Sequence, residues 1–144
     1  MQLSEHEALA RALLAAKPIL VSKLAVACQV DHSGAERLLT EVLRFLELCA
    51  ASEKSLTPSP RIDGAWHEFV LCTREYSEFC QRRFGRFVHH DPGGTVEGNR
   101  RQFQRTLRAY AVRFGPPDPA YWGDAACEIP TADCGSCESA SDPA

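Results

Sequence analysis

A carboxylate and an imidazole stand four residues apart near the middle of this sequence, at Asp63 and His67. On a helix, residues i and i+4 project from the same face, so the two side chains can share a ligand. Two more imidazoles follow after Gly85 and can supply a third donor. Two His with one carboxylate form a donor set that zinc and non-haem iron use in proteins. We therefore expect a site for a divalent metal, Zn or Fe, drawn from Asp63, His67, His89 and His90.

The length of the intervening chain sets a condition on this site. The pattern of residues 63–84 predicts one helix, which would be about 33 Å long. The five residues from Phe84 to His89 span at most about 18 Å. The imidazoles can therefore converge only if the helix ends before Arg83 or kinks. If it runs unbroken, Asp63 caps the helix and orients His67 locally, with Trp66 in the core.

The seven cysteines fall into two groups. Those in apolar, helix-like contexts are expected to behave as small buried hydrophobes. The other three lie in a polar C-terminal segment, where three thiolates with one further ligand could hold zinc. The alternative is a flexible tail whose thiols have no function. An odd count argues against a disulfide framework. The apolar group is Cys28, Cys49, Cys72 and Cys80, and the tail group, a candidate metal or thiol site, is Cys127, Cys134 and Cys137.

Charge is distributed unevenly along the chain. Residues 74–113 carry nine Arg against four acidic residues, whereas residues 116–144 carry six acidic residues and no base. Such a pattern suits either a solvated basic face or a surface that binds an acidic protein partner or this chain's own tail. The expected basic surface consists of Arg82, Arg83, Arg86, Arg101, Arg105 and Arg108. Any affinity of this surface for nucleic acid should fall steeply with salt.

Residues 20–38 fit a helix-turn-helix pattern, with Ala25 small enough for close crossing and Val30 filling the turn. The second helix would present two carboxylates and one Arg to a DNA groove, and carboxylates repel phosphate. We therefore expect this unit to pack rather than to bind specific DNA. The residues it would present are His32, Ser33, Glu36, Arg37, Thr40 and Glu41.

The remaining elements follow from apolar periodicity and from Ser/Glu pairs at capping-box spacing, Ser4 with Glu7 and Ser33 with Glu36. The predicted fold is all-α, with no strand pair. A three-helix unit of helix-turn-helix type (1–57) packs on a two-helix unit (58–126), followed by a disordered acidic tail (127–144). No run of 18 apolar residues and no apolar leader is present, so no membrane segment is expected and the location is expected to be cytoplasmic.

The run Asp63-x-x-Trp66-His67, followed by Tyr76 and Cys80 and by a Gly-Arg-x-x-His-His-x-Pro segment, resembles the glycine-rich domain-containing protein-like family. The resemblance covers roughly residues 58–123. It implies a fold and a set of supporting polar residues, Trp66, Tyr76 and Cys80, but no reaction.

These observations predict a small cytoplasmic binding or accessory protein with an Asp/His metal site. Two alternatives stay open: a metal-dependent enzyme that uses the same site, and a nucleic-acid-binding regulator that uses the helix-turn-helix unit and the Arg-rich face. Whether the protein is an enzyme is left undecided by the sequence.

Overall fold

The computed structural model describes residues 2–123 and 135–137, which form an all-α arrangement with one short strand pair. The predicted fold class is confirmed. Within these residues the helices are α1 (Glu5–Ala16), α2 (Pro18–Cys28), α3 (His32–Ala51), α4 (Pro60–Leu71), α5 (Thr73–Phe84), α6 (Val96–Phe114) and α7 (Pro119–Trp122), and the strands are β1 (His90–Pro92) and β2 (Gly135–Cys137). None of the described helices is both long enough and apolar enough to cross a bilayer.

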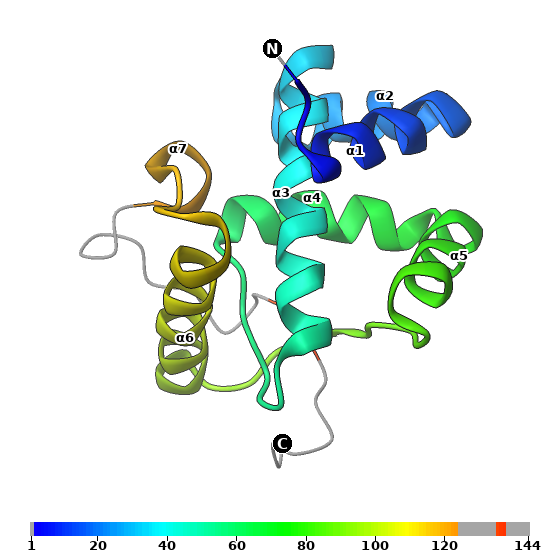
Figure 1. The fold of residues 1–144 in the computed structure, drawn as a ribbon. Coiled ribbons are helices and arrows are strands. Elements are labelled where there is room, and N and C mark those ends of the chain that lie inside the picture. The colour runs from blue at the N-terminus through cyan, green and yellow to red at the C-terminus, as the bar shows by residue number, and fades with distance from the viewer. Residues whose placement is uncertain (1, 124–134, 138–144) are drawn as a thin grey trace.

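Helix α3 stands at the centre of the molecule and contacts α1, α2, α4 and α6 (Figure 1). Its apolar residues cover more than one face, and a helix of this kind is stable only when neighbours surround it. A single cluster of buried side chains joins α3 to both the N-terminal helices and the Trp66 region. The fully buried members on α3 include Leu38, Leu39, Val42, Leu43, Phe45 and Leu46.

The second helix of the helix-turn-helix pattern is thus largely a core helix. Thr40 and Glu41, which the sequence analysis placed on its groove-facing surface, are buried. The helix is capped by Asp31, whose Oδ1 accepts from the Gly34 amide at 2.8 Å, and not by the predicted Ser33. The capping box at Ser4 is confirmed, with both of its hydrogen bonds present.

The single helix predicted for residues 63–84 is wrong, because the chain breaks at Cys72 into α4 and α5. The ring centres of Phe69 and Phe79 are 5.9 Å apart, and those of Phe69 and Tyr76 are 5.0 Å apart. On a straight helix these pairs would be separated by about 15 and 10 Å of axial rise. The break lets the Phe69 ring pack edge-on against both Tyr76 and Phe79, and it satisfies the condition for His90 to turn back towards α4.

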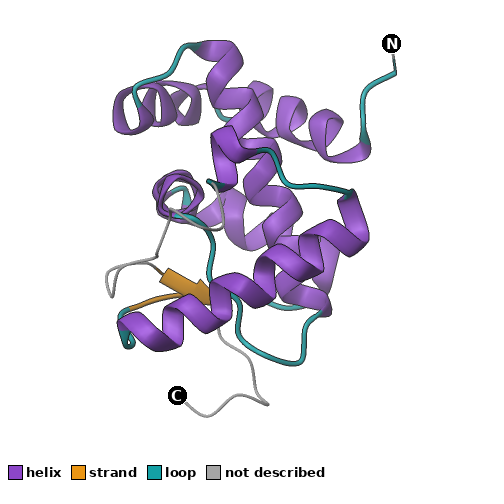
Figure 2. Ribbon diagram, turned by 90° about the vertical axis from the view of Figure 1, so that its left-hand side faces the viewer, coloured by secondary structure: helices purple, strands orange, loops and turns teal. Residues whose placement is uncertain are grey.

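The strand pair also departs from the sequence analysis, which expected none. β1 and β2 are antiparallel, with His90 opposite Cys137 and Asp91 opposite Ser136; the pair is orange in Figure 2. The predicted disorder of residues 127–144 lies outside the described residues except at 135–137, which are placed on the body. Tyr121 and Trp122 lie in α7 and are buried.

The first helix docks through a buried imidazole. His6 is 7% exposed, its ring packs edge-on to Phe114 at 5.4 Å, and its Nε2 lies 3.7 Å from Glu47 Oε2. Burial lowers the pKa of His6, and the Glu47 carboxylate only partly offsets this effect. Arg83, which bonds both Glu5 and Glu47, also disfavours the protonated ring.

The lowered pKa of His6 makes the free energy of unfolding depend on pH. Its pKa is lower in the folded state than in the unfolded state, so below about pH 6.5 the unfolded chain binds the proton more readily and folding is opposed. We expect His6→Gln to lose less stability than the wild type between pH 7.5 and pH 5. Urea unfolding at both pH values measures this, with the exposed His32→Gln as control. Equal losses in the wild type and His6→Gln would contradict the assignment.

Candidate functional site

Asp63 and His90 form the pair on which the candidate site is built. Asp63 lies in the first turn of α4, whose N-terminus is capped by Ser59. His90 opens β1, and its Nε2 lies 3.1 Å from Asp63 Oδ1. The two side chains are 10% (His90) and 18% (Asp63) exposed. An imidazole and a carboxylate 27 residues apart in sequence are therefore in direct contact at the edge of the core.

The two other predicted ligands lie differently. His67 is exposed on α4, one turn after Asp63, and the ring centres of His67 and His90 are 5.8 Å apart. His89 is also exposed, and its ring packs edge-on against Phe87 at 4.7 Å. The structure thus brings together Asp63, His67 and His90, and it favours His90 over His89 as the third member.

A chain of buried hydrogen bonds, the relay from Trp66 through Tyr76 to Val88, holds the segment that carries His90 on its core side. The Trp66 ring lies against the His90 ring at 4.3 Å between centres. Trp66 Nε1 donates to the Tyr76 hydroxyl at 3.1 Å, and that hydroxyl donates to the Val88 carbonyl, two residues before His90. Burial raises the pKa of Tyr76 and of its neighbour Cys80, so both stay protonated. The three residues predicted as supporting therefore surround the segment that carries His90.

The distances around Asp63 and His90 bear on metal binding. As they stand, no three His, Cys, Asp or Glu side chains among residues 2–123 and 135–137 form a group that could hold a metal ion. Bonds of about 2.0–2.1 Å from one tetrahedral ion place a His nitrogen and a carboxylate oxygen about 3.3 Å apart, and two His ring centres about 5 Å apart. The observed separations are 3.1 Å and 5.8 Å. The Asp63–His90 pair thus has the spacing of two ligands, and His67 lies slightly too far away.

The tail thiols are only partly described. Cys127 and Cys134 lie outside the described residues. Cys137 is buried, and its sulfur accepts a hydrogen bond from the Leu56 amide at 3.3 Å. The Cys49 side chain is the main cause that lowers the pKa of Cys137, whereas burial raises the pKa of Cys49. The contact between Leu56 and Cys137 could not be predicted, because nothing in the sequence links residue 56 to residue 137.

The predicted basic surface is dispersed. Arg83 bonds Glu5 and Glu47, while Arg86 donates to the Cys49 carbonyl and Arg105 to the Ser55 carbonyl. Three of the six guanidinium groups therefore hold the body together. Arg82, Arg101 and Arg108 are exposed, on two different helices.

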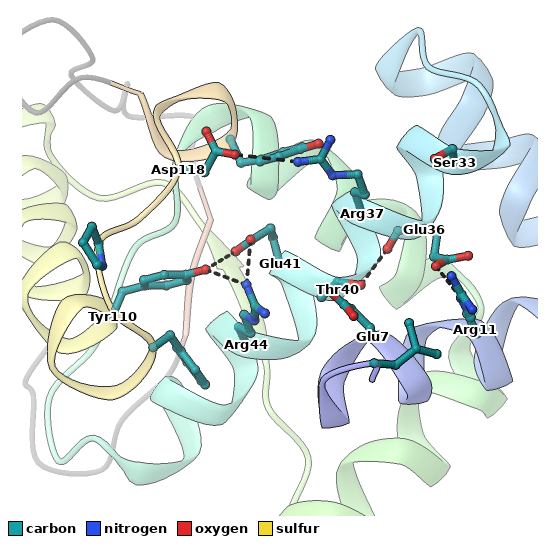
Figure 3. A pocket seen from close by; sticks show the side chains of 14 residues that line it. Glu7, Arg11, Ser33, Glu36, Arg37, Thr40, Glu41, Arg44, Tyr110 and Asp118 are labelled. Atoms are coloured by element: carbon teal, nitrogen blue, oxygen red, sulfur yellow. Dashed lines mark hydrogen bonds and ion pairs between the residues drawn. The ribbon is translucent and has the colours of Figure 1, made fainter. Parts of the chain in front are cut away.

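A polar groove of about 410 Å³ lies between α1, α3, α6 and α7 (Figure 3). At its base Glu41 Oε2 accepts from the Tyr110 hydroxyl at 2.6 Å and from Trp122 Nε1 at 2.9 Å, and Arg44 bonds Glu41 Oε1. Arg37 and Asp118 are paired at its rim, as are Arg11 and Glu36. The charged side chains that line the groove are thus largely paired with one another. We therefore interpret the groove as a contact region that holds the four helices together. No sequence pattern indicates this groove, since most of its lining residues come from four separate helices.

Comparisons with known proteins identify one family. The model of the family described as UCP032817-like matches residues 12–114, which is more than two thirds of the chain. The predicted resemblance to the glycine-rich domain-containing protein-like family is therefore wrong: the motif that suggested it lies inside the matched segment, but the segment belongs to a different family. No curated protein and no solved structure gives a significant match.

Removing the Tyr76 hydroxyl should destabilise the fold around the Asp63–His90 pair. In Tyr76→Phe, the buried Trp66 indole N–H and the Val88 carbonyl both lose a partner, which should lower the free energy of unfolding by about 1–3 kcal/mol. Chemical denaturation measures this. Tyr121→Phe is the control, because no hydrogen bond of its hydroxyl is found within the described part of the chain. A loss for Tyr76→Phe no larger than for Tyr121→Phe would contradict the relay.

Proposed function

Since the chain belongs to the UCP032817-like family, a description that names no activity, we propose from its own geometry that it is a small accessory protein that binds a divalent transition metal through Asp63, His90 and His67. The observation that carries the proposal is the 3.1 Å contact between Asp63 Oδ1 and His90 Nε2, with a second imidazole beside it.

The two inner ligands are already held in place. Asp63 is fixed by the first turn of α4, and His90 by the Trp66 ring and by the strand that follows the Val88 carbonyl. Asp63 and His90 would hold the ion through one carboxylate oxygen and the His90 Nε2, whose 3.1 Å separation is close to that of two ligands of one ion. Ligands positioned before binding reduce the entropy lost on binding, which supports a site of useful affinity.

The third ligand needs only a side-chain rotation. His67 is exposed, so its ring can adopt another staggered rotamer without disturbing the core. Two His and one carboxylate match zinc and non-haem iron, and zinc held by three protein ligands keeps a fourth position for water or for another molecule. That open position is where an accessory protein would receive a polar ligand from its partner.

A cytoplasmic location fits the same proposal. The described cysteines, including the half-buried Cys28 and Cys72, are free thiols. Free thiols persist in reducing compartments, and disulfide frameworks are typical of secreted chains. A chain with unpaired thiols and a thiol-independent metal site is suited to the cytoplasm.

Zinc titration of the full chain tests the proposal. Isothermal titration calorimetry of the metal-free protein with Zn²⁺ should show one site per chain. His90→Ala and Asp63→Asn should each weaken binding by more than the roughly 10–100-fold that loss of an outer-shell partner costs, because each changes a metal ligand itself. His67→Ala should weaken it as well, by removing the third.

His89→Ala is the matched control, since it removes an imidazole next to the site without removing a proposed ligand. It should bind zinc as the wild type does. Unchanged zinc affinity in His90→Ala and Asp63→Asn, or an equal loss in His89→Ala, would overturn the proposal. Circular dichroism spectra of the variants separate lost ligands from lost folding.

A further inference from the structure

Strand β2 has a backbone partner along each of its two edges. On one edge it pairs with β1, with Asp91 opposite Ser136 and His90 opposite Cys137. On the other edge the Cys137 amide donates to the Leu56 carbonyl at 3.0 Å, and the Leu56 amide donates to Cys137 Sγ at 3.3 Å. Successive residues of a strand direct their backbone groups to opposite edges, so β2 lies between β1 and Leu56.

The segment that contains Leu56 is anchored in the core and leads directly into α4. Residues 55–59 are buried, and the Ser59 hydroxyl donates to the Tyr121 carbonyl at 2.6 Å. Helix α4 begins at the next residue, and Asp63 lies in its first turn. Strand β2 therefore connects β1 to the start of the helix that carries the carboxylate of the proposed metal site.

The register also places Cys137 beside His90. Residues directly opposite each other in an antiparallel pair have their side chains on the same face, with Cβ atoms about 4.5–5.5 Å apart. Cys137 is 1% exposed, and the His90 side chain is 10% exposed. When β2 leaves β1, His90 therefore loses a neighbour on its own face of the strand pair.

We propose that β2, the C-terminal strap of residues 135–137, is a positioning element of the metal site: it holds His90 at Asp63, and docking of the strap and binding of the metal strengthen each other. The second part rests on the proposed function, whereas the positioning of His90 needs no metal. Ligands held in place before binding lose less entropy when the ion binds. By reciprocity, a strap that raises the affinity for the ion is itself held more tightly once the ion is bound.

The small size of the strap makes the metal affinity adjustable. A three-residue strand opens locally at a lower free energy than the helices of the core. Only molecules with a docked strap hold His90 ready for the ion, so the apparent affinity falls with the fraction of molecules whose strap is docked. A partner that captures residues 135–137 would therefore lower the metal affinity of the chain.

Ser136→Pro tests the strap without removing a cysteine or a proposed ligand. Proline cannot donate to the strand pairing and is not accommodated in the middle of a paired strand. Ser139→Pro is the matched control, since it introduces the same ring beyond the end of β2. Isothermal titration calorimetry should show zinc binding at least about tenfold weaker in Ser136→Pro, the size of an outer-shell loss, and unchanged in Ser139→Pro.

Two NMR measurements on the full chain separate the strap from the metal site. Without metal, Ser136→Pro should shift the ring resonances of His90, which His90→Ala assigns, and leave those of the buried His6 unchanged. In the wild type, saturating zinc should slow hydrogen exchange of the Cys137 amide by the same factor of about ten or more, because the coupling is reciprocal. Zinc should not slow this exchange in His90→Ala.

Unchanged zinc affinity or unchanged His90 resonances in Ser136→Pro would overturn the proposal. So would Cys137 amide exchange that zinc leaves unaltered in a chain that binds zinc, and this measurement needs no substitution that could impair folding. A wild type that binds no zinc would contradict the proposed function and the coupling. The expected shift of the His90 resonances would in that case still confirm that the strap positions His90.

Discussion

The burial of α3 is the constraint on which the rest of the arrangement depends. A helix covered on several faces must pair its polar side chains with protein groups, because an unsatisfied buried carboxylate is strongly destabilising. Glu41 meets this need through Tyr110 and Trp122, which bring α6 and α7 against α3. Phe45, one turn further on, packs against both Trp66 and Trp122. The placement of α4, and so of Asp63, follows from these contacts.

Much of the local structure could be predicted from the sequence, because it depends on neighbouring residues. The start of α2 and the capping box at Ser4 follow from Pro18, Ser4 and Glu7. The break at Cys72 could not be predicted. The apolar stripe of α4 continues into α5 at helical spacing, and no Pro interrupts it, so periodicity favours one helix. The edge-to-face packing of Phe69 with Tyr76 and Phe79 favours the break instead, and it is a tertiary interaction.

For the candidate site too, nearby residues predict part of the arrangement, and contacts between distant residues decide the rest. Residue types and chain length indicated that Asp63 and an imidazole beyond Gly85 could meet if the helix was interrupted. Adjacent residues in an extended segment point to opposite sides, so only one of His89 and His90 can face Asp63. Residue type and chain length do not show which of the two it is. The relay from Trp66 through Tyr76 to Val88 makes that choice. The pairing of β1 with β2 links residues more than 40 apart, and a three-residue strand carries too little pattern to reveal it.

The family match covers the residues of the Asp63–His90 site but not the strand that pairs with β1. Residues 12–114 include Asp63, His67 and His90 together with the side chains that hold them, and they also include Cys49. Cys137 lies beyond the match. His90 is therefore held from the core side by residues within the matched segment, and within the described residues it is paired with the tail through the register of β1 and β2. The Asp63–His90 contact thus joins two elements of the matched segment, α4 and β1, whereas the strand that pairs with β1 lies beyond it.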